Sequence, residues 1–213
     1  MFSFLKSSSK PKIFVIGLGK TGTTTMDVLL REFGFRVGNQ RQGEKLLEHW
    51  YKRDFKPILD LTKTADAFQD VPFGLPYTFE VLHAQYPNAK FILTLRDSAE
   101  QWADSLIRFH SSIFADGKRV PTIEDLKNAT YIFKGRAYLA NRWIYNTPED
   151  DPYHRDSLIQ FYKNHEAQVR NYFRSIPDSL LVINVSNQSD FLSLTHFLEV
   201  KTNRTNFPWE NKT

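Results

Sequence analysis

The chain has 213 residues, is 41% hydrophobic and 15% aromatic, and carries a formal net charge of +4 at pH 7. This length and composition suit one globular domain with a sizeable core, and the mildly basic balance favours an anionic ligand over a nucleic acid. The absence of cysteine excludes disulfides and thiolate metal sites. No apolar run is long enough for a membrane span or a signal segment, so we expect a cytoplasmic protein without a membrane anchor.

In chain order, residues 1–11 are expected to form a flexible lead-in, and residues 12–213 a single domain. The apolar patterns predict strands at 12–17, 35–37, 91–95 and 180–185, with a short strand or extended turn at 57–61. Helices are expected at 22–33, 44–55, 77–86, 99–114, 131–145, 157–173 and 190–198. Strands alternating with helices predict an α/β fold with a mainly parallel central sheet and helices on both faces.

The most informative segment is the loop 17–25, Gly-Leu-Gly-Lys-Thr-Gly-Thr-Thr-Thr, which follows the first apolar run and precedes a helix. Strand, glycine loop and helix N-terminus together form an anion cradle, because backbone N–H groups and the helix dipole both favour negative charge. Lys20 adds a full positive charge. We therefore expect a phosphate-bearing ligand at this loop.

The loop departs from the Walker A pattern of nucleotide hydrolases. Gly17 and Gly22 have the Walker spacing, but Thr23 occupies the position of the Walker lysine, and the lysine precedes Gly22 instead. This argues against ATP or GTP hydrolysis. The string Lys20-Thr21-Gly22-Thr23-Thr24 instead resembles the 5′-phosphosulfate loop of sulfotransferases that use 3′-phosphoadenosine 5′-phosphosulfate (PAPS). The resemblance implies a P-loop-like topology, PAPS as donor, the bisphosphate PAP as product, and donor binding by Gly19, Lys20, Thr21, Gly22, Thr23, Thr24 and Thr25.

A second constellation begins at Arg96, at the carboxyl end of the strand 91–95, where open α/β sheets bind ligands. Its planar donor fork suits a phosphate. Ser98 and Gln101 predict a capped helix start. The segment resembles the 3′-phosphate motif of the same family, which implies that Arg96 and Ser105 hold that phosphate. The arginine-to-serine spacing is nine residues instead of the usual eight, which one extra residue in the turn 98–100 would explain and which leaves Ser98 as an additional or substitute contact.

Sulfuryl transfer needs a cation on the leaving phosphate and a base for the proton of the acceptor. Lys20 is the cation. Asp70 stands where cytosolic relatives have a catalytic histidine, so the resemblance implies that Asp70 is the base, while an Asx-type turn before Pro72 is an equal alternative. Rival bases are Glu80, His83 and His110. We expect no metal, because no histidines stand at a ligand spacing with a carboxylate.

The resemblance runs from residue 12 almost to the end, including the tail turn 206–211. Residues 115–155 have no counterpart in it and are expected to form an acceptor-binding helical insertion. The acceptor is expected to be a small molecule or a carbohydrate; its identity and the oligomeric state are not readable from the sequence. Two other functions stay open: a small nucleotide or nucleoside kinase, and a non-catalytic anion-binding protein on the same fold.

Overall fold

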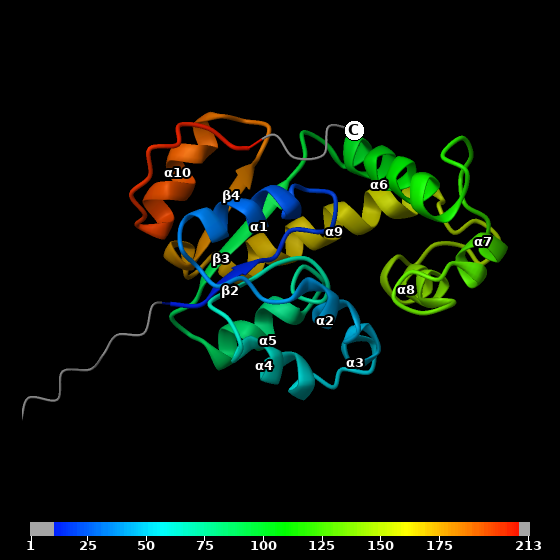
Figure 1. The fold of residues 1–213 in the computed structure, drawn as a ribbon, viewed down its shortest axis with the longest axis horizontal. Helices are drawn as coiled ribbons and strands as arrows, with labels where there is room; N and C mark the ends of the chain where they lie inside the picture. Colours follow the sequence, from blue (N-terminus) through cyan, green and yellow to red (C-terminus); the bar gives the residue numbers. More distant parts are fainter. Residues whose placement is uncertain (1–10, 209–213) are drawn as a thin grey trace, which may run out of the picture.

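Among residues 11–208, four parallel strands form the centre of the fold, in the spatial order β2–β1–β3–β4 (Figure 1). Their bounds are Ile13–Val15 (β1), Ala67–Phe68 (β2), Lys90–Leu95 (β3) and Leu180–Asn184 (β4). In register, Phe14 lies opposite Phe91, and Phe91 opposite Leu180. The computed structural model describes residues 11–208, so most of the expected lead-in and the end of the tail turn lie outside the described residues.

The helices follow the strands along the chain and cover the sheet. Their bounds are Thr23–Glu32 (α1), Gln40–Glu44 (α2), Leu47–Tyr51 (α3), Lys56–Thr62 (α4), Thr78–Gln85 (α5), Ala99–Phe114 (α6), Ile123–Asn128 (α7), Arg136–Ile144 (α8), Arg155–Phe173 (α9) and Ser189–Leu198 (α10), with a 3-10 turn at Pro177–Ser179. Within residues 11–208, no helix combines the length and the apolar character that crossing a membrane requires.

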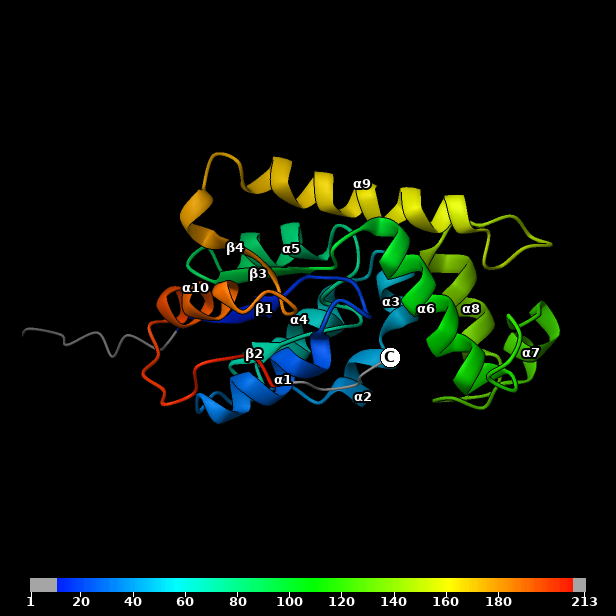
Figure 2. The same ribbon diagram turned by 90° about the horizontal axis from the view of Figure 1, so that it is seen from above.

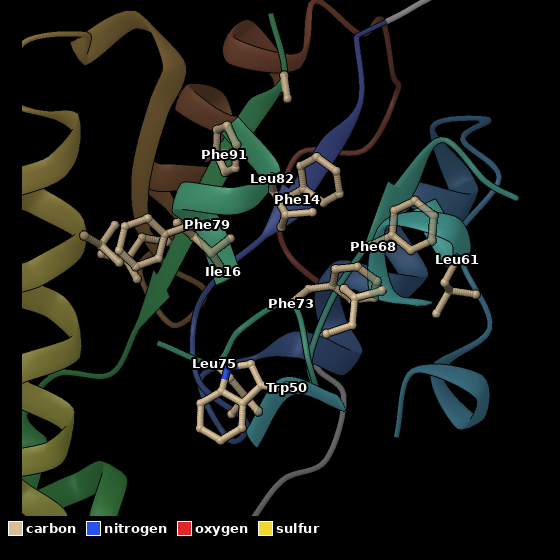
Figure 3. Packing of buried hydrophobic residues seen from close by; sticks show 14 of the residues in the cluster. Phe14, Ile16, Trp50, Leu61, Phe68, Phe73, Leu75, Phe79, Leu82 and Phe91 are labelled. Carbon is tan, nitrogen blue, oxygen red and sulfur yellow. The ribbon is translucent and has the colours of Figure 1, made fainter. Parts of the chain in front are cut away.

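The alternation of side chains along β1 divides the core between the two faces of the sheet. Ile13 and Val15 pack on one face with the apolar sides of α1 and α10. Phe14 and Ile16 point to the other face, where α4, α5 and α9 supply the partners. Figure 2 shows α9 and α5 on one side of the strands and α1 on the other, and Figure 3 shows the aromatic packing around Phe14. The expected parallel α/β fold with helices on both faces is confirmed.

A third cluster lies beyond the carboxyl ends of the strands. Trp102 and Leu106 of α6 pack there against residues of α7, α8 and α9, including Leu126, Ala137 and Leu158. Figure 2 shows α6, α7 and α8 gathered at this end of the molecule. The expected insertion 115–155 therefore forms part of a wall above the sheet edge at which ligands bind in α/β folds.

Three sequence-based predictions need correction. Residues 57–61 are helical, as part of α4, because Pro57 occupies the first turn and Ile58 and Leu61 point to the core. Residues 35–37 form no strand; Val37 makes a single bridge to Ala67. The expected helix 44–55 is helical only at Leu47–Tyr51 (α3); Glu44 is the last residue of α2, and residues 52–55 lie between α3 and α4.

His165 of α9 contacts the chain just after β1, and its burial leads us to expect that the stability of the fold depends on pH. Its side chain is 3% exposed, its Nε2 lies 2.8 Å from the carbonyl oxygen of Ile16, and its Nδ1 has no hydrogen-bond partner among the described residues. Burial lowers the pKa of His165 to about 4. As the pH falls, His165 therefore binds a proton in the unfolded chain before it does so in the folded protein. The contribution of its neutral form to stability is complete only above the ordinary pKa of histidine.

We expect the free energy of unfolding to fall by about 3 kcal/mol from this group as the pH drops from about 6.5 to about 4. Urea unfolding at a series of pH values measures the slope. His165→Gln should flatten the slope in this window, whereas His196→Gln, at an exposed position of α10, should leave it unchanged. Equal slopes for wild type and His165→Gln would contradict the assignment.

Candidate active site

A pocket of about 230 Å³ opens at the carboxyl ends of β1 and β3. Its walls come from the glycine loop, the first turn of α1, the segment after β2, and helices α2, α6 and α8. The residues that line it include Gly19, Lys20, Gly22, Thr23, Thr24, Thr25, Glu44, Asp70, Arg96, Phe109, His110, Tyr131, Arg136, Asn141 and Tyr145. Most of the donor-binding residues implied by the sequence thus meet Asp70 in one cavity.

The glycine loop is held from below by β3. Thr21 is fully buried, and its Oγ1 lies 2.6 Å from both the carbonyl oxygen of Leu18 and Oγ1 of Thr94. A Cβ at Gly17 would lie 2.0 Å from Thr94 Oγ1, so this close approach requires glycine. Thr21 therefore supports the loop from inside and does not line the pocket.

The same loop is held from the side by α6 and Arg96. The indole N–H of Trp102 donates to the carbonyl oxygen of Gly19 at 2.9 Å, and Nε of Arg96 donates to the carbonyl oxygen of Lys20 at 2.6 Å. Lys20 itself has a φ of 74°, in the left-handed region. Such a backbone conformation in a non-glycine residue persists only when its surroundings hold it, as these bonds do.

Helix α1 begins at the pocket. Gly22 is its N-cap with a φ of 105°, and a Cβ there would come within 2.6 Å of Val185 Cγ2. The first turn of an α-helix carries N–H groups that make no bond within the helix, and the dipole places partial positive charge at this end. Thr23, Thr24 and Thr25 form this turn and line the cavity, which suits an anion.

Two cationic side chains, Lys20 and Arg96, add to the positive charge at the N-terminus of α1. Nζ of Lys20 lies 4.0 Å from the centre of the Phe109 ring. Burial lowers the pKa of Lys20, and the nearby charge of Arg96 lowers it further, while Asp70 opposes the shift. The pKa of Arg96 is lowered by burial as well. Two partly buried cations without an ion-pair partner among the described residues form a site that an anionic ligand would stabilise.

Asp70 lies against the glycine loop, on the segment that follows β2. Thr23 Oγ1 donates to its Oδ2 at 3.0 Å, the N–H of Val71 donates to its Oδ1 at 2.9 Å, and a Cβ at Gly19 would lie 3.5 Å from Oδ1. Burial raises the pKa of the Asp70 carboxyl, and the negative charge of Glu44 raises it further. A carboxylate with a raised pKa inside a cavity has the character of a general base.

The rival bases are placed differently. Glu80 is exposed on α5 and does not line the pocket. His83 packs its ring against Phe91 and Phe173 on the core face, away from the cavity lining. His110 does line the pocket, but its Nδ1 lies 2.8 Å from the hydroxyl of Tyr153, and burial lowers the pKa of His110 to about 3. A base so weak is a poor proton acceptor near neutral pH.

Unlike Arg96, Ser105 lies outside the lining of the pocket. It lies on α6 as expected, but it is 2% exposed, its Oγ has no hydrogen-bond partner among the described residues, and it does not line the pocket. Ser98 caps α6, since its Oγ accepts from the N–H of Gln101 at 3.1 Å. The second half of the expected capping box is absent, because the Gln101 side chain accepts from Asp97 N instead.

Sequence reasoning did not predict a cluster of polar side chains that lines the pocket close to Asp70. Glu44 of α2 and Arg136 of α8 form a buried ion pair, and the hydroxyl of Tyr131 donates to Glu44 Oε1 at 2.7 Å. Tyr145 and Asn141 also line the pocket. These residues come from α2 and from the segment 131–145, which lie far apart in the chain, so no spacing between the two segments signals the site.

The family model described as "Sulfotransferase domain" matches residues 12–213, which is nearly the full length. The comparison with curated proteins gave no match. The glycine loop, the arginine at the end of β3 and the parallel sheet thus occur together with a family match over almost every residue, and the chain belongs to the sulfotransferase-domain family.

Proposed function

We propose that this protein transfers a sulfuryl group from PAPS to the hydroxyl or amine of a small-molecule or carbohydrate acceptor. The observation that carries the proposal is the meeting of Lys20, Arg96 and Asp70 in one cavity at the N-terminus of α1. Cations and helix N–H groups suit the phosphates of the donor, and a carboxylate with a raised pKa suits the acceptor proton.

In the proposed in-line displacement, different residues of the pocket act on the acceptor and on the donor. The acceptor oxygen or nitrogen forms a bond to sulfur while the bond from sulfur to the 5′-phosphate oxygen breaks, and the electron pair leaves with that oxygen on PAP. Asp70 takes the acceptor proton. Lys20 stabilises the negative charge that grows on the leaving oxygen, and the first turn of α1 holds the 5′-phosphate.

The donor is tested by calorimetry with two nucleotides. Because the lysine precedes Gly22 and Thr23 stands in the Walker position, we expect PAP to bind and ATP to bind more weakly. A fold of this kind that bound ATP more tightly than PAP would be a kinase-like protein, and the proposal would fail.

Arg96→Ala is expected to weaken PAP binding by about 2–5 kcal/mol, because it removes a charge-assisted contact to the 3′-phosphate. Adenosine 5′-phosphate, which lacks that phosphate, should lose far less affinity. Titration of both ligands against wild type and variant makes the comparison. Arg96 also holds the Lys20 carbonyl, so an equal loss for both ligands would show that its role is limited to supporting the loop.

A further inference from the structure

A buried tyrosine reaches the backbone of Arg96 from outside the pocket. Tyr162 of α9 is 4% exposed, and its hydroxyl oxygen accepts a hydrogen bond from the N–H of Arg96 at 2.9 Å. The two residues are 66 positions apart in the sequence. Burial raises the pKa of the Tyr162 hydroxyl to about 12, so the group is uncharged at neutral pH. Because Tyr162 does not line the pocket, it is placed to act on a ligand only through Arg96.

The bond from Tyr162 lies at the point where the sheet stops supporting the chain. Arg96 is the first residue after β3, and the pairing of β3 with β4 ends at Leu95. The Tyr162 hydroxyl therefore supplies the partner that this N–H needs and fixes the backbone from which the guanidinium extends. Nε of Arg96 donates to the carbonyl oxygen of Lys20, and its two terminal nitrogens have no hydrogen-bond partner among residues 11–208. These nitrogens are available to an anion in the pocket that Arg96 lines.

Tyr162 is itself held in place by its surroundings. The centre of its ring lies 5.2 Å from that of Trp102, the residue whose indole N–H donates to Gly19. One turn further along α9, Nε2 of His165 lies 2.8 Å from the carbonyl oxygen of Ile16. Helix α9 thus contacts the chain just after β1 and just after β3. These contacts give the Tyr162 hydroxyl a defined position relative to the glycine loop.

We propose that Tyr162 is a positioning residue for the 3′-phosphate of the donor: its hydroxyl fixes the backbone of Arg96, and Arg96 contacts the phosphate. This inference rests on the proposed function and adds to it a residue that does not touch the substrate. Without the hydroxyl, the N–H of Arg96 loses its partner, and the backbone can shift toward another acceptor. A tyrosine with a purely structural role would contribute to stability without preference for one phosphate of the ligand.

Tyr162→Phe tests this role, because the ring can stay on Trp102 and only the hydroxyl is lost. Affinities for PAP and for adenosine 5′-phosphate, which lacks the 3′-phosphate, are measured by calorimetry on wild type and variant. We expect PAP to bind about three- to tenfold more weakly to the variant, and the affinity for adenosine 5′-phosphate to change by less than about twofold. An unchanged PAP affinity, or an equal loss for both ligands, would overturn the proposal.

A double-mutant cycle with Arg96→Ala shows whether the hydroxyl acts through Arg96. Once the guanidinium is gone, the position of the backbone at residue 96 should no longer matter to the 3′-phosphate. We therefore expect Arg96→Ala and the double variant to bind PAP with equal affinity, because the two effects are coupled. A general loss of stability would produce no such coupling. Losses in PAP affinity that simply add would show that Tyr162 acts elsewhere and would overturn the proposal.

Tyr172→Phe is the matched control. It also removes a tyrosine hydroxyl from α9, one that lies 3.0 Å from Nδ1 of His83, and Tyr172 does not line the pocket. This variant should bind both nucleotides as wild type does, and a loss of PAP affinity equal to that of Tyr162→Phe would contradict the assignment. If wild type itself does not bind PAP, the proposed function fails before any variant is compared, and this inference fails with it.

Discussion

Asp70→Asn should lower turnover by roughly 10²–10⁴-fold while donor affinity stays near that of wild type. The amide keeps the shape of the side chain: its oxygen can still accept from the N–H of Val71 and its NH2 group can donate to the hydroxyl of Thr23, but it cannot take a proton. Because burial and Glu44 raise the pKa of Asp70, wild-type activity should fall on the acid side at a higher pH than an ordinary carboxyl would give. The variant should lose this acid limb.

The variants Glu80→Gln and His83→Ala test whether the general base is Asp70 or a residue of α5. Neither residue lines the pocket, so both variants should keep their activity. Asp70→Asn should lower the turnover of an alcohol acceptor more than that of a phenol, because a phenol loses its proton more readily without a base. If Asp70→Asn is active and either α5 variant is dead, the base belongs to α5. If all three are active, Asp70 is a turn residue and the proton leaves without a protein base.

Lys20→Met should lower kcat by roughly 10²-fold or more, with a smaller loss in donor affinity. The physical reason is that negative charge grows on the leaving oxygen only as the bond to sulfur breaks. The ammonium of Lys20 rests on Phe109 in this structure and has no ion-pair partner among the described residues, so it is available for that oxygen. Single-turnover rates and PAP titrations separate the two effects.

Lys127→Met is the matched control. Its Nζ lies 5.1 Å from the ring centre of Tyr138, so the variant also loses a lysine and a cation–ring contact, but Lys127 does not line the pocket. The control should keep wild-type kcat. A Lys20→Met enzyme with unchanged kcat and a raised KM would show that Lys20 holds the donor in the ground state only.

The features that could be read from the sequence are local ones. The glycine loop, the strand 91–95 with Arg96 at its end, and helix α6 with Ser98 as N-cap each depend on residues within one short segment. The parallel sheet could be predicted because buried apolar runs alternate with amphipathic helices along the chain. Helix α4 was missed because Ile58, Leu59 and Leu61 also fit a strand; the proline in its first turn and the Lys56–Asp60 pair were the signals for a helix.

The polar cluster of the pocket close to Asp70 could not be predicted, for a different reason. Glu44, Arg136 and Tyr131 meet only because α2 and α8 pack across the cavity, and tertiary packing leaves no fixed spacing in the sequence. The position of Asp70 was available only through resemblance. The assignment of Ser105 to the 3′-phosphate stays a prediction, and its buried hydroxyl outside the pocket lining is the feature that a donor-bound structure would have to explain.

The most direct test of the sulfuryl-transfer proposal is product formation from PAPS. The protein is incubated with PAPS and a panel of neutral alcohols, phenols and amines, and both PAP and sulfated acceptor are quantified by mass spectrometry. We expect PAP and one sulfated product to appear in equal amounts, and both to be nearly lost with Lys20→Met. No product from PAPS with any acceptor, together with phosphoryl transfer from ATP to one of them, would contradict the proposed function.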